Sequence, residues 1–151
     1  MNYRHLFSQV CQKPGMYVCP SCFSNVCSFI YGFDTARDSA PLMGFREWLV
    51  LRNKKGDNLG RPGLAMIELG IEPYGPTAED RSESIAALGR LLEEFFTHRE
   101  TNGLHAVYSA YHLWLSKQSW TKQPSKKRPK KLVPAAWVHK KGAKVRRATG
   151  Q

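Results

Sequence analysis

The chain has 151 residues, of which 42% are hydrophobic, and a formal net charge of +11 at pH 7. This length allows one domain with one core, and the apolar content is ordinary for a globular protein. No apolar run approaches the roughly 20 residues that a membrane helix needs, and the start MNYRHLFSQV lacks the apolar stretch of a signal peptide. We therefore expect no membrane partner and a cytoplasmic protein whose cysteines are reduced.

The positive charge is concentrated at the C-terminal end of the chain. Residues 1–116 hold 11 Lys and Arg against all 12 Asp and Glu, a net charge of −1, whereas residues 117–151 hold the other 12 Lys and Arg and no acid. Blocks of like charge repel one another, and this end has too little apolar surface to offset the entropy of ordering. We therefore predict a helical domain over residues 1–117 and a flexible basic tail over residues 118–151.

The first forty residues show two helical patterns. A first helix, ending at Lys13-Pro14-Gly15, is predicted by apolar residues at helical spacing, namely Tyr3, Leu6, Phe7 and Val10. Met16-Tyr17-Val18 should follow as an extended apolar plug. A second helix should begin near residue 23, with Asp34 facing water and Ser39-Ala40-Pro41 ending it.

Two shorter helices are expected in the middle of the chain. Residues 44–55 place Phe45, Trp48 and Leu49 on one side of a third helix. The Gly and Pro residues of LGRPGLAMIELGIEPYGP argue against a long element after it. Leu64–Leu69 could be one short helix or a strand, and we predict a helix, followed by a loop over residues 72–79.

Residues 81–117 carry the strongest structural signal. Apolar residues from Ile85 to Phe96 recur at helical spacing, and Gly89 lies on that stripe, where we expect a neighbouring element to approach closely. Thr101-Asn102-Gly103 breaks the pattern before a second stripe begins at Leu104. Neither helix can bury its stripe alone, so the two should fold against each other. The sequence thus predicts an all-α fold of about five short helices around one core, with a C-terminal helical hairpin and then a disordered basic tail.

The four cysteines allow two interpretations. The spacing of Cys19 and Cys22 lets two thiolates reach one zinc ion, and it could support a small zinc-stabilised module. The outer cysteines, Cys11 and Cys27, do not have the spacing of a zinc ribbon, and both fall on predicted inner faces of helices. Buried cysteine behaves as a small apolar residue. We therefore interpret all four as core or incidental thiols and expect no metal ligands and no cofactor.

No catalytic constellation is apparent. His98, His105 and His112 lie seven residues apart, but Asn102-Gly103 interrupts the helix between the first two, and we interpret them as half-exposed packing residues. The adjacent pair Glu93-Glu94 must point in different directions on a helix, which argues against a catalytic carboxylate pair. Phosphate-binding loops, nucleophile motifs and helical zinc motifs are not found, so we do not expect an enzyme.

The tail provides the clearest binding signal. Cations on a mobile segment neutralise phosphates and release counterions, and the interspersed Trp120 and Trp137 can stack on unpaired bases. The same pattern fits a nuclear import signal, an anionic surface or a solvating tail without a ligand. The candidate nucleic-acid-binding residues are Lys126, Lys127, Arg128, Lys130, Lys131, Lys140, Lys141, Lys144, Arg146 and Arg147.

The opening segment carries three short motifs, Lys13-Pro14-Gly15-Met16-Tyr17, Gly32-Phe33 and the acidic-aromatic Phe45-Arg46-Glu47-Trp48-Leu49. In these motifs the chain resembles a group of small bacterial helical proteins of unassigned function that have a Lys/Arg-Pro-Gly-Met-Tyr motif near the N-terminus. The resemblance covers about residues 3–55 and the hairpin, and it does not cover the tail. It implies an immunity-like or accessory role without catalytic residues. The group is expected to have Gly where this chain has Cys19, which implies that this cysteine is incidental.

Three functions follow as hypotheses. The leading one is a non-enzymatic cytoplasmic helical domain that binds an unknown protein partner, in an immunity-like or accessory role. The first alternative is a nucleic-acid-binding protein acting through its basic tail, with an affinity that falls steeply with salt. The second alternative is the zinc-stabilised module built on Cys19 and Cys22.

Overall fold

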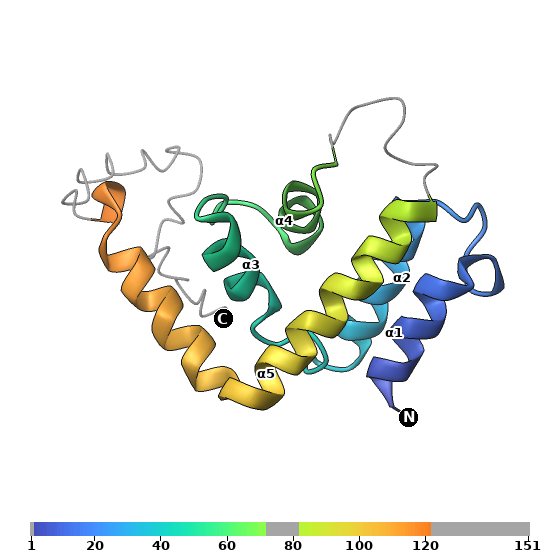
Figure 1. Cartoon of the computed structure of the whole chain (residues 1–151), viewed down its shortest axis with the longest axis horizontal. Coiled ribbons are helices and arrows are strands. Elements are labelled where there is room, and N and C mark those ends of the chain that lie inside the picture. The colour runs from blue at the N-terminus through green and yellow to red at the C-terminus, as the bar shows by residue number, and fades with distance from the viewer. Residues whose placement is uncertain (1, 72–81, 122–151) are drawn as a thin grey trace, which may run out of the picture. The chain divides into compact units, whose positions relative to one another are not determined.

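The computed structural model describes residues 2–71 and 82–121, and in these residues the only regular structure is helical (Figure 1). The predicted all-α fold is confirmed for this part of the chain, including the four N-terminal helices. The predicted loop over residues 72–79 lies outside the described residues. The chain divides into two units, residues 1–118 and 119–151. The elements in order are α1 (Tyr3–Gln12), η1 (Pro14–Met16), α2 (Phe23–Ala36), α3 (Phe45–Asn53), α4 (Arg61–Glu68), α5 (Ser82–Ser116) and η2 (Ser119–Thr121).

The core of residues 1–118 receives side chains from all five α-helices. Figure 1 shows α1, α2 and the first half of α5 side by side, with α3 and α4 inside the bend of α5. One fully buried side chain from each helix illustrates the convergence: Phe7, Ile30, Leu49, Leu64 and Phe95. Burying a side chain of this size contributes about 1.5–3 kcal/mol to the stability of the fold. The apolar faces of the five helices together can therefore stabilise a single core.

Both ends of α1 are set by residues in the sequence next to them. The side chain of Asn2 caps α1 by accepting a hydrogen bond from the amide of His5 at 3.2 Å. Pro14 has no N–H with which to continue the helix, and it starts the 3₁₀ turn η1. Met16 is 75% exposed, so the prediction that it plugs the core is wrong. Because η1 bends the chain where an extended path was expected, only Tyr17 and Val18 pack against the core.

The long helix α5 is broken at Gly103, in the segment where the sequence predicted a break. Gly103 has φ 76° and ψ 161°, which are not helical values, and glycine tolerates positive φ without a steric penalty. In Figure 1 the two halves of α5 diverge from this point. The second half packs on α3: a Cβ placed on Gly44 would lie 2.9 Å from Leu104, and Arg46 donates a hydrogen bond to the hydroxyl of Tyr111 at 3.3 Å. The hairpin therefore closes around α3 and does not close directly on itself.

Asp34 is completely buried, so the prediction that it faces water is wrong. Its Oδ1 accepts a hydrogen bond from the amide of Leu42 at 2.8 Å, and its Oδ2 pairs with the guanidinium of Arg61. The carbonyl of Asp34 also accepts the amide of Ser39 at 2.8 Å. A buried carboxylate persists only when it is paired and hydrogen-bonded. Asp34 thus fastens the loop before α3, and α4 beyond it, to the end of α2.

Gly89 is a point of close approach between two helices, in agreement with the prediction. A Cβ at this position would lie 3.0 Å from the Cβ of Cys11 on α1 and 3.5 Å from its sulfur atom. The absence of a side chain at Gly89 therefore allows α1 and α5 to come this near. The contact fixes the line along which the two helices meet, and the candidate site lies along that line.

Candidate functional site

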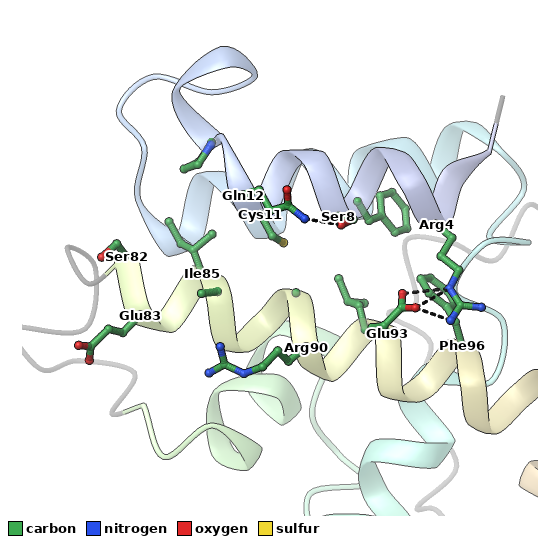
Figure 2. Close-up of a pocket in the computed structure, with 15 residues that line it drawn as sticks. Arg4, Ser8, Cys11, Gln12, Ser82, Glu83, Ile85, Arg90, Glu93 and Phe96 are labelled. Atoms are coloured by element: carbon green, nitrogen blue, oxygen red, sulfur yellow. Dashed lines mark hydrogen bonds and ion pairs between the residues drawn. The ribbon is translucent and has the colours of Figure 1, made fainter.

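A groove of about 690 Å³ lies between α1 and the first half of α5 (Figure 2). The residues that α1 contributes fall on one face of that helix, from Arg4 to Gln12, and those of α5 fall on one face from Ser82 to Phe96. The polar side chains lie at the ends and edges of the groove. The floor is apolar and is formed by the buried side chains of Phe7, Cys11, Ile85, Leu92 and Phe96.

The groove is elongated. From Ser82 to Phe96 it follows α5 for about 21 Å, at a rise of about 1.5 Å per residue. This length is about four helical turns, so the groove can contact several successive side chains of an element that lies along it.

Arg4 closes one end of the groove by reaching from α1 to α5, as Figure 2 shows. Its Nε donates to both carboxylate oxygens of Glu93 at 2.9 Å, and its Nη groups donate to Glu100 at 2.6 Å and to the hydroxyl of Thr97 at 3.1 Å. The bonds to Glu93 and Glu100 raise the pKa of Arg4, and the bond from Arg4 lowers the pKa of Glu93. The Glu93 side chain is 54% exposed, so water screens the pair and its contribution to stability is small. The cluster mainly supplies a polar end wall.

The edge of the groove on α5 carries two charged side chains that have no partner among residues 2–71 and 82–121. Glu83 and Arg90 are exposed, and neither makes a hydrogen bond or an ion pair with any residue that the structure describes. They lie seven residues apart, which is about two helical turns, so they share one side of the helix. Ala86, between them, is also exposed. This edge thus presents one acid and one base, about 10 Å apart along the axis, to whatever covers the groove.

The groove was not predictable as a site, although Phe7, Ile85 and Phe96 were expected on the inner faces of their helices. A weak signal was present on α1, where Arg4, Ser8 and Gln12 repeat every four residues beside the apolar stripe. Nothing in that spacing shows which helix lies opposite. The acids and bases of α5 alternate along an exposed surface in the same uninformative way.

Glu93 and Glu94 have different partners, as adjacent residues on a helix should. Glu93 pairs with Arg4 of α1, whereas Glu94 pairs with Arg52 of α3. Arg52 also donates to Glu68 of α4 at 2.7 Å, which joins three helices through one guanidinium. These two glutamates pair with different helices and do not form a carboxylate pair.

The four cysteines are distributed between core and surface. Cys11 and Cys27 are buried, Cys22 is half-buried and Cys19 is exposed. Burial raises the pKa of Cys11 and of Cys27 to about 12, so both remain neutral thiols near neutral pH. Within residues 2–71 and 82–121, no group of three His, Cys, Asp or Glu is arranged to hold a metal ion. The zinc hypothesis therefore has no third ligand in this part of the chain.

The three histidines are not brought together into a site. The ring of His98 packs beside Trp48 with centroids 6.1 Å apart. His105 and Ser109 are neighbours one turn apart, with Nε2 and Oγ separated by 3.5 Å. His112 is exposed. His98 is half-buried, in agreement with the prediction, whereas His105 and His112 are exposed, so the prediction that they are half-exposed packing residues is wrong.

The predicted nucleic-acid-binding residues of the tail, from Lys126 to Arg147, lie outside the described residues. Trp137 lies there too, whereas Trp120, in η2, is 49% exposed. Among the helices of the described segments, none has an apolar stretch long enough to cross a membrane.

Comparisons with known protein families, with curated proteins and with solved structures find no match to this chain. The resemblance of the opening segment therefore stays a prediction.

Proposed function

We propose that residues 1–118 are a protein-binding module, and that the groove between α1 and α5 receives the apolar face of a helix from a partner protein. The observation that carries the proposal is the shape of the groove: a long floor of buried apolar side chains that follows α5. Small-molecule sites are compact concavities that enclose their ligand. A groove that follows a helix for about four turns instead suits a row of anchors at i, i+4 and i+7 on a second helix.

The edge of the groove indicates the chemistry of the partner. Arg90 and Glu83 have no partners among the described residues, so a complementary helix should carry an acid and a base about two turns apart beside its apolar anchors. Three anchors of the size of Leu would contribute roughly 5–9 kcal/mol by burial. The loss of translational and side-chain freedom subtracts several kcal/mol from that sum. The remainder is only a few kcal/mol, so we expect these anchors alone to give a weak, reversible complex.

The test blocks the groove without touching the core. Ala86→Arg places a long charged side chain at the edge of the groove, and Ala106→Arg makes the same change at an exposed helix position after Gly103. Both full-length variants should fold, because arginine is nearly as good a helix former as alanine. Each is used to capture proteins from a nuclease-treated lysate of the native host. A partner retained by the wild type and by Ala106→Arg should be lost with Ala86→Arg.

A peptide from the captured partner then tests the recognition chemistry directly. The peptide should become helical on binding, Arg90→Glu should weaken it, and reversing the matching acid of the peptide should restore binding. Retention of the partner by Ala86→Arg would refute the proposal. Failure of any protein to bind, or displacement of the peptide by a metabolite that purifies with the chain, would also refute it.

We also propose nucleic-acid contact through the tail as a second candidate function. Its support is the charge distribution: all of the net positive charge lies in residues 117–151, beside a nearly neutral domain. Replacing Lys126, Lys127, Lys130 and Lys131 with Gln in the full chain should weaken binding to a labelled single-stranded oligonucleotide and reduce its dependence on salt. Ala86→Arg should leave this binding unchanged, so the two candidates can fail separately.

A further inference from the structure

The last stretch of α5, residues 104–116, lies against the start of α3 (Figure 1). We call this stretch the arm. Its buried side chain is Val107, which would lie 3.7 Å from a Cβ placed on Gly44, so the arm rests directly on the backbone at that glycine. Arg46 adds a hydrogen bond to the hydroxyl of Tyr111 at 3.3 Å. One small surface at the start of α3 therefore holds the arm in place.

Gly103 turns the arm toward that surface. Its φ of 76° and ψ of 161° fall in a region that is essentially restricted to glycine. A Cβ at Gly103 would meet no atom of the described residues within 4 Å, apart from the adjacent backbone of its own helix. Packing around Gly103 therefore does not impose the bend. The contacts of the arm with α3 hold the bend instead, and glycine makes it accessible.

A second form of α5 follows from the same residues. The segments on both sides of Gly103 are already helical, so helical dihedral angles at this one residue would join them into a straight helix. The straight form would carry the arm away from α3 of its own chain, which exposes Val107 and uncovers the surface around Gly44. A second straight copy restores both losses, because its arm carries the same side chains.

We propose that this surface of α3, around Gly44 and Arg46, binds the arm of a second copy of the chain, in a dimer whose two members exchange arms. The exchange keeps each contact of the arm, now made between chains, and replaces two bends by two continuous helices. Association costs translational and rotational freedom, so the bent form prevails at low concentration and the dimer at high concentration. None of the residues involved lines the groove between α1 and α5, so the exchange does not depend on the proposed function.

Gly103→Ala tests the exchange in the full-length protein, with Gly32→Ala as the matched control. Both glycines lie inside α-helices, and a Cβ at either one meets no atom of another described element within 4 Å, but Gly103 alone of the two has a positive φ. Alanine at this position strains the bent form and favours the straight helix in each of two chains, so the dissociation constant of the dimer should fall by at least about a thousandfold. Light scattering after gel filtration in reducing buffer should show Gly103→Ala as a dimer at concentrations where the wild type and Gly32→Ala are monomers.

A second measurement shows whether the arms are exchanged. In dimers mixed from isotope-labelled and unlabelled copies, filtered NOE spectra should place Tyr111 of one chain beside Arg46 of the other, whereas a dimer of bent chains keeps this contact within each chain. Refolding the wild type from urea at high protein concentration should yield the same dimer, and this result decides the matter if Gly103→Ala does not fold. A monomeric Gly103→Ala, a dimer without the contact between chains, or a wild type that refolds only to monomers would overturn the inference.

Discussion

Replacing Gly89 with alanine should destabilise the domain, whereas the same change at Gly32 should stabilise it. Both glycines lie inside α-helices, where alanine is favoured by about 1 kcal/mol. A Cβ on Gly32 would meet no atom within 4 Å, but a Cβ on Gly89 would lie 3.0 Å from the Cβ of Cys11. A Cβ contact of 3.0 Å is tighter than ordinary carbon contacts, so α1 would have to move by a few tenths of an ångström. Overpacking of this kind costs about 1–3 kcal/mol, which leaves a net loss of about 1 kcal/mol at Gly89.

The two variants should therefore differ by about 2 kcal/mol in the free energy of unfolding, or on the order of 8 °C in melting temperature. Urea and thermal unfolding followed by far-UV circular dichroism measure this difference. Comparing two identical substitutions largely cancels the effect of alanine on the unfolded chain. If Gly89→Ala proves as stable as Gly32→Ala, then α1 and α5 do not touch at Gly89. The geometry of the groove, which depends on that contact, would then be wrong.

Three further predictions concern charge and protonation. Asp34→Ala should cost about 3–5 kcal/mol in urea unfolding, and Asp34→Asn, which keeps an acceptor of the same shape, should cost clearly less; equal losses would contradict the hydrogen-bonding role. Cys11 and Cys27, with a pKa of about 12, should escape alkylation in the native protein at about pH 8, which mass spectrometry measures. The free energy of unfolding should fall as the pH rises above about 8.5, because the two thiols ionise there in the unfolded chain but stay neutral in the folded one. Because Arg4 lowers the pKa of Glu93, the small contribution of this pair to the free energy of unfolding is present above about pH 4.3 and is lost as the pH falls through the pKa of Glu93 in the folded protein. Arg4→Gln should flatten that part of the curve of stability against pH.

Features that depend on neighbouring residues were predictable from the sequence. The apolar spacing of residues 3–10 determines which side of α1 faces inward, whatever covers it. The break at Gly103 follows from a conformation that this residue type tolerates. Gly89 was recognisable because a glycine on an apolar helix stripe has a cost in propensity that close packing can offset. Each of these features depends only on the spacing and the residue types within one helical segment.

Features that depend on distant residues were not predictable. Asp34 appeared to face water when only its own helix was considered, but Arg61, 27 residues away, and a folded-back loop bury it. The groove was still harder to predict, because Arg4 and Glu93, which meet at its end, are 89 residues apart in the sequence and no motif connects them. Spacing reveals that a helix has an inner face, but it does not identify the surface that the face meets. The candidate binding residues of the tail, in contrast, were predicted from composition, which does not indicate how residues are arranged in space.

The break at Gly103 also has a consequence for hydrogen exchange. The half of α5 before it buries Ile85, Leu88, Leu91, Leu92, Phe95 and Phe96, whereas the half after it buries only Val107. Regions with few buried contacts open locally, at a free energy well below that of global unfolding. Amides beyond Val107 should thus exchange within local opening events, while those around Leu92 should exchange only when the whole domain unfolds. The two halves of α5 would then be separate cooperative units, and the second could lose and regain its order without disturbing the first.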